Sequence, residues 1–252
     1  MKTWTLAGAW ARSHSQHRLD IWARSLLPLL QIYVLIEIWS GAVDDSRIFT
    51  YLCVVNMLMW LNQSTIPWYI TDRIREGTIT TELMRPVGFP AQVLSHQMGS
   101  TAARATALIG MIPLTVLLAG LRAPASPTAG VLFAAGALLS YAVSVGMYGL
   151  LGVAGFWLHQ TSGVVWTFSL VNALLAGTFI PLPLFPAGLR EVVELLPFGA
   201  VGYTPAAVYA GMLDGWPAVR AIGVQAIWCA VLAAAIAVVW RRAQHRVVSQ
   251  GG

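Results

Sequence analysis

The stretch 72–89 is a dense group of charged side chains between two long apolar runs. It reads DRIREGTITTELMRPVGF, in a chain of 252 residues of which only 10% are charged. Carboxylates and guanidinium groups in such a cluster can form charge-assisted hydrogen bonds to a soluble partner. Gly77 accepts the left-handed geometry that ends one helical piece, and Pro86 stops a second. We expect the charged partner contacts at Asp72, Arg73, Arg75, Glu76 and Arg85, with Ile74, Ile79 and Leu83 buried against that partner. The alternative is a charged loop that only sets membrane orientation.

Two further ionisable residues, Glu37 and Arg104, lie well inside apolar runs. Charged groups at such depth are costly in lipid and indicate a functional role with a partner. Both lie at a similar distance from the expected inner ends of their spans, so an ion pair between them is one prediction. The alternatives are that Glu37 reaches the outer interface, or that Arg104 extends to the inner membrane edge.

Polar amides also occur inside the apolar runs. These side chains either line a polar path between two subunits or hydrogen-bond neighbouring helices together. The sequence leaves both interpretations open. The residues concerned are Asn56, Asn62, Gln63 and Asn172.

Catalytic patterns are missing from the sequence. The single lysine, Lys2, excludes a phosphate-binding loop of the GxxxxGK[ST] type, and the five histidines form no HExxH motif. No GxSxG elbow is present either, and Asp44-Asp45 is better explained by a solvated turn than by a metal site. We therefore expect no cofactor on this chain, and ATP and Mg only on a partner chain if ATP is used.

The elements that position these residues are membrane helices. The chain is 57% hydrophobic, with a mean hydropathy of +0.68, and a helix needs about 20 apolar residues to cross a bilayer. We expect one domain over 1–252, all-α, with six transmembrane helices. The expected spans are 25–42, 48–70, 91–121, 129–156, 163–182 and 217–240.

Three other segments complete this layout. Residues 1–24 are expected to form an amphipathic interfacial helix, with a polar tail as the alternative. Residues 183–216 are too proline-rich for one span and too apolar for a water-exposed loop, which favours short helices dipping into the outer leaflet, sheltered by protein. In the fourth span, glycines recur every three residues at 146, 149, 152 and 155, and predict a face packed against another helix.

The distribution of basic residues predicts the orientation. With six spans, ten of the fifteen lysines and arginines fall on the side of the termini, four on the other side and one inside a span. The positive-inside rule then places both termini and residues 72–89 in the cytoplasm. Since the basic residues lie at the edges of apolar runs, the net charge of +5 does not indicate nucleic-acid binding.

Two motifs resemble those of ABC-2-type permeases, the membrane subunits of bacterial ABC exporters, and most of all the group of daunorubicin-type drug exporters. The first is an Ile-Arg-x-Gly core followed by Leu-x-Arg-Pro, at Ile74 to Gly77 and Leu83 to Pro86. The second follows a proline-rich start with Phe-Pro-x-x-Leu-Arg, Leu-Pro-Phe and Tyr-x-Pro. Its residues here are Phe185, Pro186, Leu189, Arg190, Leu196, Pro197, Phe198, Tyr203 and Pro205.

The resemblance implies an architecture and a function. Residues 72–89 would hold a coupling helix, and 183–216 would form re-entrant helices. The chain would be the permease of an exporter in the bacterial inner membrane, moving a drug, lipid, glycan or peptide. It would assemble with a second permease, identical or paralogous, and with two ABC ATPase subunits. The alternative is an integral membrane enzyme acting on a lipid.

Overall fold

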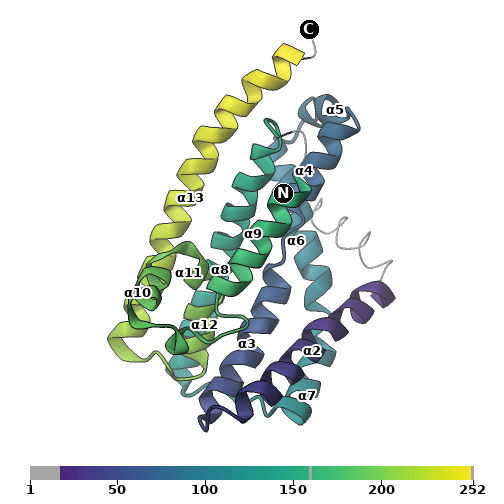
Figure 1. Cartoon of the computed structure of the whole chain (residues 1–252). Helices are drawn as coiled ribbons and strands as arrows, with labels where there is room; N and C mark the ends of the chain where they lie inside the picture. The colour runs from purple at the N-terminus through teal and green to yellow at the C-terminus, as the bar shows by residue number, and fades with distance from the viewer. Residues whose placement is uncertain (1–17, 159–160, 251–252) are drawn as a thin grey trace.

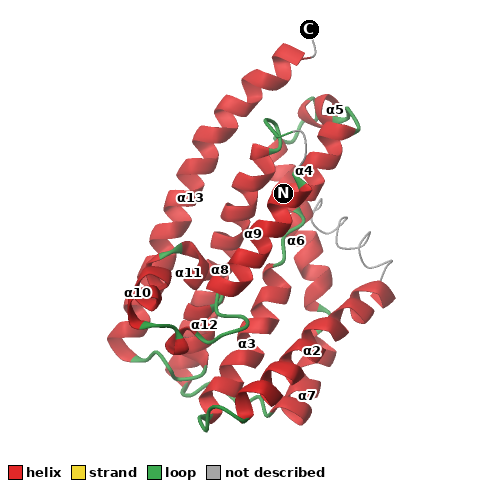
Figure 2. Ribbon diagram, in the orientation of Figure 1, coloured by secondary structure: helices red, strands yellow, loops and turns green. Residues whose placement is uncertain are grey.

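The computed structural model describes residues 18–158 and 161–250, and this part of the chain is helical, without a strand (Figure 2). The longer helices lie together as a bundle (Figure 1). In chain order, the elements are α2 (Arg18–Ser40), α3 (Ser46–Asn62), α4 (Ile66–Arg75), α5 (Ile79–Leu83), α6 (Phe89–Ala105), α7 (Leu108–Ala119), α8 (Pro127–Ala154), α9 (Ser162–Leu175), the 3-10 turn η1 (Leu182–Leu184), α10 (Ala187–Leu195), α11 (Pro197–Val201), α12 (Tyr203–Tyr209) and α13 (Gly215–Gln250).

Three helices among the described residues are long and apolar enough to cross a membrane: α2, α8 and α13. They correspond to the expected first, fourth and sixth spans. The expected third span consists of α6 and α7, which are bent by 44° and raise the number to four if counted as one span. At 14 residues α9 is a short apolar helix. The structure thus supports three or four spans, and the six-span layout stays a prediction. The expected interfacial segment falls largely on residues 1–17, outside the described part.

The expected second span is broken between α3 and α4, around the polar residues Asn62 to Thr65. Pro67 in the first turn of α4 favours a helix start, because it has no backbone N–H to leave unpaired. Two side chains satisfy other free N–H groups at this start. Gln97 Oε1 accepts from the Thr65 N–H at 2.9 Å, and Ser64 Oγ accepts from the Ile66 N–H at 3.2 Å. Specific side-chain hydrogen bonds, one of them to Gln97 of α6, therefore stabilise the break between α3 and α4.

The glycine face of α8 packs against other helices, as predicted. A Cβ added at Gly146 would lie 2.8 Å from Leu232 Cβ on α13, and one at Gly152 would lie 2.8 Å from Ile70 Cδ1 on α4. Distances below 3.0 Å are not found for real Cβ contacts. The small residues therefore let α8 approach both neighbours closely.

The segment between α9 and α13 is broken into η1, α10, α11 and α12, and much of it is buried. Backbone carbonyls of a broken segment need partners wherever water is excluded. Side chains of the long helices supply them here. The donor and acceptor pairs are Tyr51 Oη to Gly177, Asn56 Nδ2 to Thr178, Trp39 Nε1 to Phe179, Trp228 Nε1 to Leu195, Gln225 Nε2 to Ala200 and Ser140 Oγ to Val201.

Candidate functional site

The charged stretch 72–89 forms a bent helical hairpin, which we call the elbow. α4 ends at Arg75, Gly77 turns the chain with φ +69°, and α5 follows from Ile79 to Leu83. The left-handed turn at Gly77 is the one that the sequence predicts. In Figure 1, α5 lies at the end of the bundle toward which the last turns of α13 also run, and α10–α12 lie toward the other end. The elbow is thus presented at one extreme of the molecule.

A buried carboxylate holds the elbow together. Glu82 Oε2 lies 2.9 Å from Arg85 Nη1, and Glu82 Oε1 lies 3.6 Å from Arg73 Nε. The Glu82 side chain is 7% exposed. Gln92 Nε2 on α6 donates to the backbone carbonyls of Glu82 at 2.9 Å and Val87 at 2.7 Å. Arg73 and Arg85, expected to bind a partner, are therefore engaged inside the chain, and Glu82 is a structural residue that the sequence interpretation did not single out.

The apolar side chains of the elbow also pack inside this chain. Ile79 is buried in a cluster with residues of α4 and α6, and Ile74 and Leu83 pack against the same cluster. The expectation that they bury against a partner is therefore wrong for Ile79 and is not needed for the other two. The reason is that α4, α5 and the start of α6 fold back on one another and bury each other's apolar faces.

The outward surface of the elbow combines charge with one large apolar side chain. Asp72, Arg75, Glu76 and Pro86 are exposed, and the Met84 side chain is 84% exposed. Methionine is flexible and polarisable, and it adapts to a partner's apolar pocket. The sequence interpretation did not single out Met84. Its position as the variable residue of the Leu-x-Arg-Pro motif was the only feature that could have drawn attention to it.

Arg104 is the second-last residue of α6, just before the bend between α6 and α7, and it is buried, with 7% of its surface exposed. Its guanidinium donates to Gln63 O at the α3–α4 break, to Ser100 Oγ at 2.9 Å and to Thr101 Oγ1 at 3.3 Å. Glu37 is exposed on α2 and forms no ion pair among the described residues. The single chain does not bring Glu37 and Arg104 together; Arg104 instead braces the helix break.

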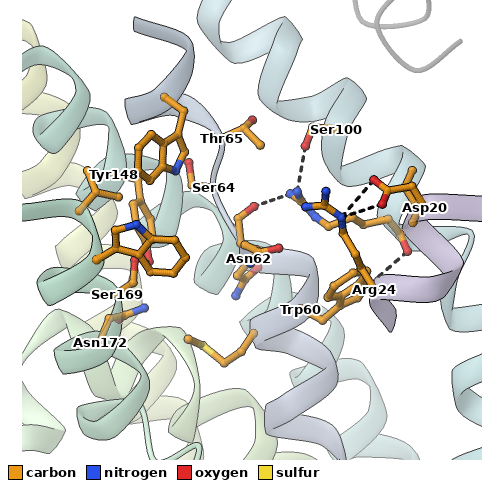
Figure 3. Close-up of a pocket in the computed structure, with 17 residues that line it drawn as sticks. Asp20, Arg24, Trp60, Asn62, Ser64, Thr65, Ser100, Tyr148, Ser169 and Asn172 are labelled. Carbon is orange, nitrogen blue, oxygen red and sulfur yellow. Dashed lines mark hydrogen bonds and ion pairs between the residues drawn. The ribbon is translucent and has the colours of Figure 1, made fainter. Parts of the chain in front are cut away.

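Two adjoining cavities contain all four predicted path residues. The first, which we call the Arg104 cavity, has a volume of about 540 Å³ and is lined by Asn62, Gln63 and Asn172. Figure 3 shows Asp20, Arg24 and Ser100 on one side of Asn62 in this cavity, and Tyr148, Ser169 and Asn172 on the other. The second, the Asn56 cavity, is about 550 Å³. The residues that line both are Arg24, Met59, Trp60, Gln63 and Trp166.

The four amides differ in their hydrogen bonds. Asn56 Nδ2 donates to Leu52 O at 2.9 Å, and Asn62 Nδ2 donates to Ser140 Oγ at 2.7 Å, so both hold helices or turns together. The Gln63 side chain is exposed, and Asn172 Oδ1 is buried without a hydrogen-bond partner among the described residues. Gln63 and Asn172 therefore remain available to a bound molecule.

The prolines of the second motif mark helix starts. Pro186 directly precedes α10, and Pro197 is the first residue of α11. The aromatic residues pack inward, with Tyr203 against Tyr51 and Phe198 against Phe168. The remaining residues are Phe185, packed on the core; Pro205, buried in α12; Leu189, exposed on α10; and Arg190, paired with Glu194 at 2.7 Å. These roles are structural, and their place in the outer leaflet stays a prediction.

Comparisons with known proteins identify the family but not the cargo. Among the described residues, no group of three or more His, Cys, Asp or Glu side chains could hold a metal ion. A comparison with curated proteins found no significant match. The profile of one family, described as ABC-2 family transporter protein, matches residues 26–251, nearly the whole chain. With its apolar spanning helices, this chain is a multi-pass membrane protein that belongs to the ABC-2 family of transporter proteins.

Proposed function

We propose that this chain is the permease subunit of an ATP-driven exporter in the bacterial inner membrane, with both termini in the cytoplasm. Two copies, or this chain and a paralogue, would assemble with two ABC ATPase subunits and move a hydrophobic or amphipathic cargo outward. ATP and Mg would bind the ATPase subunits, with no cofactor on this chain. The observation that carries the proposal is the elbow, in a chain whose family is that of transporter membrane subunits.

The elbow is suited to transmit motion. Its carboxylate Glu82 and its apolar cluster fix α5 to α4 and α6, so a push on α5 would move these helices as a unit. α4 also packs on α8 across Gly152, the glycine next to Ile70. A displacement of the elbow would therefore reach the centre of the bundle. Packed helices transmit such displacements because protein interiors are dense and compress little.

The two adjoining cavities support a role in transport. They run beside the α3–α4 break, from the Arg104 cavity with Asn172 to the Asn56 cavity with Phe179 at the start of the broken segment. The break and the α6–α7 bend are places where a spanning helix can change its shape. Motion delivered by α4 would thus act directly on the wall of the Arg104 cavity, which Trp68 of α4 lines, and would reach the Asn56 cavity through the α3–α4 break.

The first experiment is co-purification from native membranes in mild detergent, with identification of bound chains and an assay of ATP hydrolysis. Met84→Asp places a charge where we expect an apolar anchor, and Arg75→Ala removes an exposed cation. We expect either variant to weaken ATPase binding by about tenfold or more, corresponding to about 1.4 kcal/mol.

Two variants serve as matched controls at the opposite end of the molecule. Leu189→Asp also places a charge at an exposed apolar residue, and Arg220→Ala also removes an exposed arginine. Both should leave ATPase binding unchanged. If no ATPase co-purifies with the wild type, or if the controls weaken binding as much as the elbow variants, then the elbow is not the coupling surface.

A further inference from the structure

The Arg104 cavity contains an unbalanced positive charge. Its charged lining residues are Asp20, Arg24 and Arg104. Asp20 and Arg24 pair with each other, with Asp20 Oδ2 at 3.0 Å from Arg24 Nε. In the described part of the chain no carboxylate lies within 4.0 Å of Arg104. The cavity therefore has one buried cation more than it has anions.

Bracing the helix break does not account for this charge. The three acceptors of Arg104 are all neutral, and its Nε is buried without a hydrogen-bond partner. A guanidinium carries five N–H donors, so three acceptors leave it incompletely satisfied. A buried charge without a counter-charge is costly, and a neutral amide would have made the same bond to Gln63 O. An anion bound in the cavity would supply the counter-charge that Arg104 lacks among the described residues.

The rest of the wall indicates what carries the anion. Trp60, Trp68, Trp166 and Tyr148 line the cavity together with apolar residues such as Val165. Its volume of about 540 Å³ lies in the range of small-molecule sites. We propose, building on the exporter function above, that the Arg104 cavity binds an amphipathic anion: a carboxylate or phosphate group attached to an apolar or aromatic body. Asn172, across the cavity, adds a polar group that fixes orientation.

Binding can be tested with a matched pair of molecules. The full-length protein, together with any chains that co-purify with it, is reconstituted in nanodiscs of phosphatidylcholine. A bromine-tipped fatty acid is then titrated, and in parallel the bromine-tipped fatty alcohol of equal length. Bromine quenches nearby tryptophans, three of which line the cavity. We expect the acid to quench saturably, and to do so at a concentration about tenfold or more below that needed for the alcohol. A tenfold difference in affinity is what one modest charge interaction contributes. Equal quenching by acid and alcohol in the wild type would overturn the proposal without any variant.

Variants then assign the preference to Arg104. Arg104→Gln should lose the preference for the acid, and Arg104→Lys should retain it because the charge remains. Arg220→Gln, at an exposed arginine outside the cavity, should behave as wild type. A thermal unfolding curve accompanies each variant. If Arg104→Gln is folded and still prefers the acid, then Arg104 only braces the α3–α4 break and the proposal that it binds the anion is overturned.

The anion has two sources, a lipid headgroup or an exported cargo, and phosphatidylglycerol separates them. If adding this anionic lipid to the nanodiscs displaces the fatty acid, the occupant is a lipid headgroup; if it does not, the site selects a cargo. The outcome is independent of the exporter test. Acid preference without a bound ATPase would overturn only the exporter function, and a bound ATPase without acid preference would overturn only the anion site.

Discussion

Replacing Glu82 with glutamine tests whether a buried charge holds the elbow rigid. Glu82→Gln keeps the size of the side chain and removes its charge. The close contact to Arg85 at 2.9 Å is an ion pair to a buried carboxylate, and breaking a fully buried ion pair costs about 3–5 kcal/mol. The contact to Arg73 at 3.6 Å is too long to add a full bond. Because the Arg85 side chain is 55% exposed, water reduces the effect, and we expect a loss of about 1–2 kcal/mol.

Hydrogen exchange measures this loss locally. The amides of Glu82, Met84 and Arg85 bond to carbonyls within the elbow and exchange when it opens. A loss of about 1–2 kcal/mol should accelerate their exchange roughly 5- to 30-fold. The control is Glu76→Gln, which breaks an exposed contact to Arg73 worth below about 1 kcal/mol. Unchanged exchange in Glu82→Gln, or an equal effect of Glu76→Gln, would refute the reasoning.

Two further predictions concern stability in detergent. Gly199→Ala places a Cβ about 2.7 Å from the backbone carbonyl of Val193, and overpacking of this kind should cost about 1–3 kcal/mol; Gly188→Ala, with nothing within 4 Å, is the control, and thermal unfolding compares them. Asp45→Ala removes the N-cap of α3 and should cost about 0.5–2 kcal/mol at pH 7. Hydrogen bonds from Arg47 lower the pKa of Asp45, so the cap contributes fully above the unfolded value of about 3.9 and is lost as pH falls through the lowered pKa. Unfolding curves should therefore converge in acid, and a constant gap between pH 7 and pH 3 would contradict the assignment.

Hydrophobic runs predict the long helices well because lipid requires long apolar segments. The first, fourth and sixth expected spans overlap α2, α8 and α13. The helix break was harder to predict, because residues Asn62 to Thr65 look in sequence like polar residues inside one continuous span. Only the structure shows that Gln97 and Arg104 satisfy the backbone there. A run of sequence letters does not say which distant side chain completes a broken turn.

The sequence predicted where the candidate site lies, but not which of its charged residues face a partner. The elbow lies where the charge pattern placed it, and Gly77 has the left-handed turn expected of it. Pattern alone cannot separate a charge that faces a partner from one that pairs internally, since Arg73 and Arg75 look alike in sequence. The fold distinguishes them: Arg73 lies 5.0 Å above the Tyr69 ring and beside Glu82, and Arg75 is exposed.

The hydrogen bonds that shelter the broken segment before α13 also impose an order on biosynthesis. Tyr51 and Asn56, which serve Gly177 and Thr178, are made before the segment. Gln225 and Trp228, which serve Ala200 and Leu195, are made after it. The carbonyls of Leu195 and Ala200 therefore obtain these donors only after the last helix has been made. A chain truncated before Gln225 would lack the donors for both carbonyls.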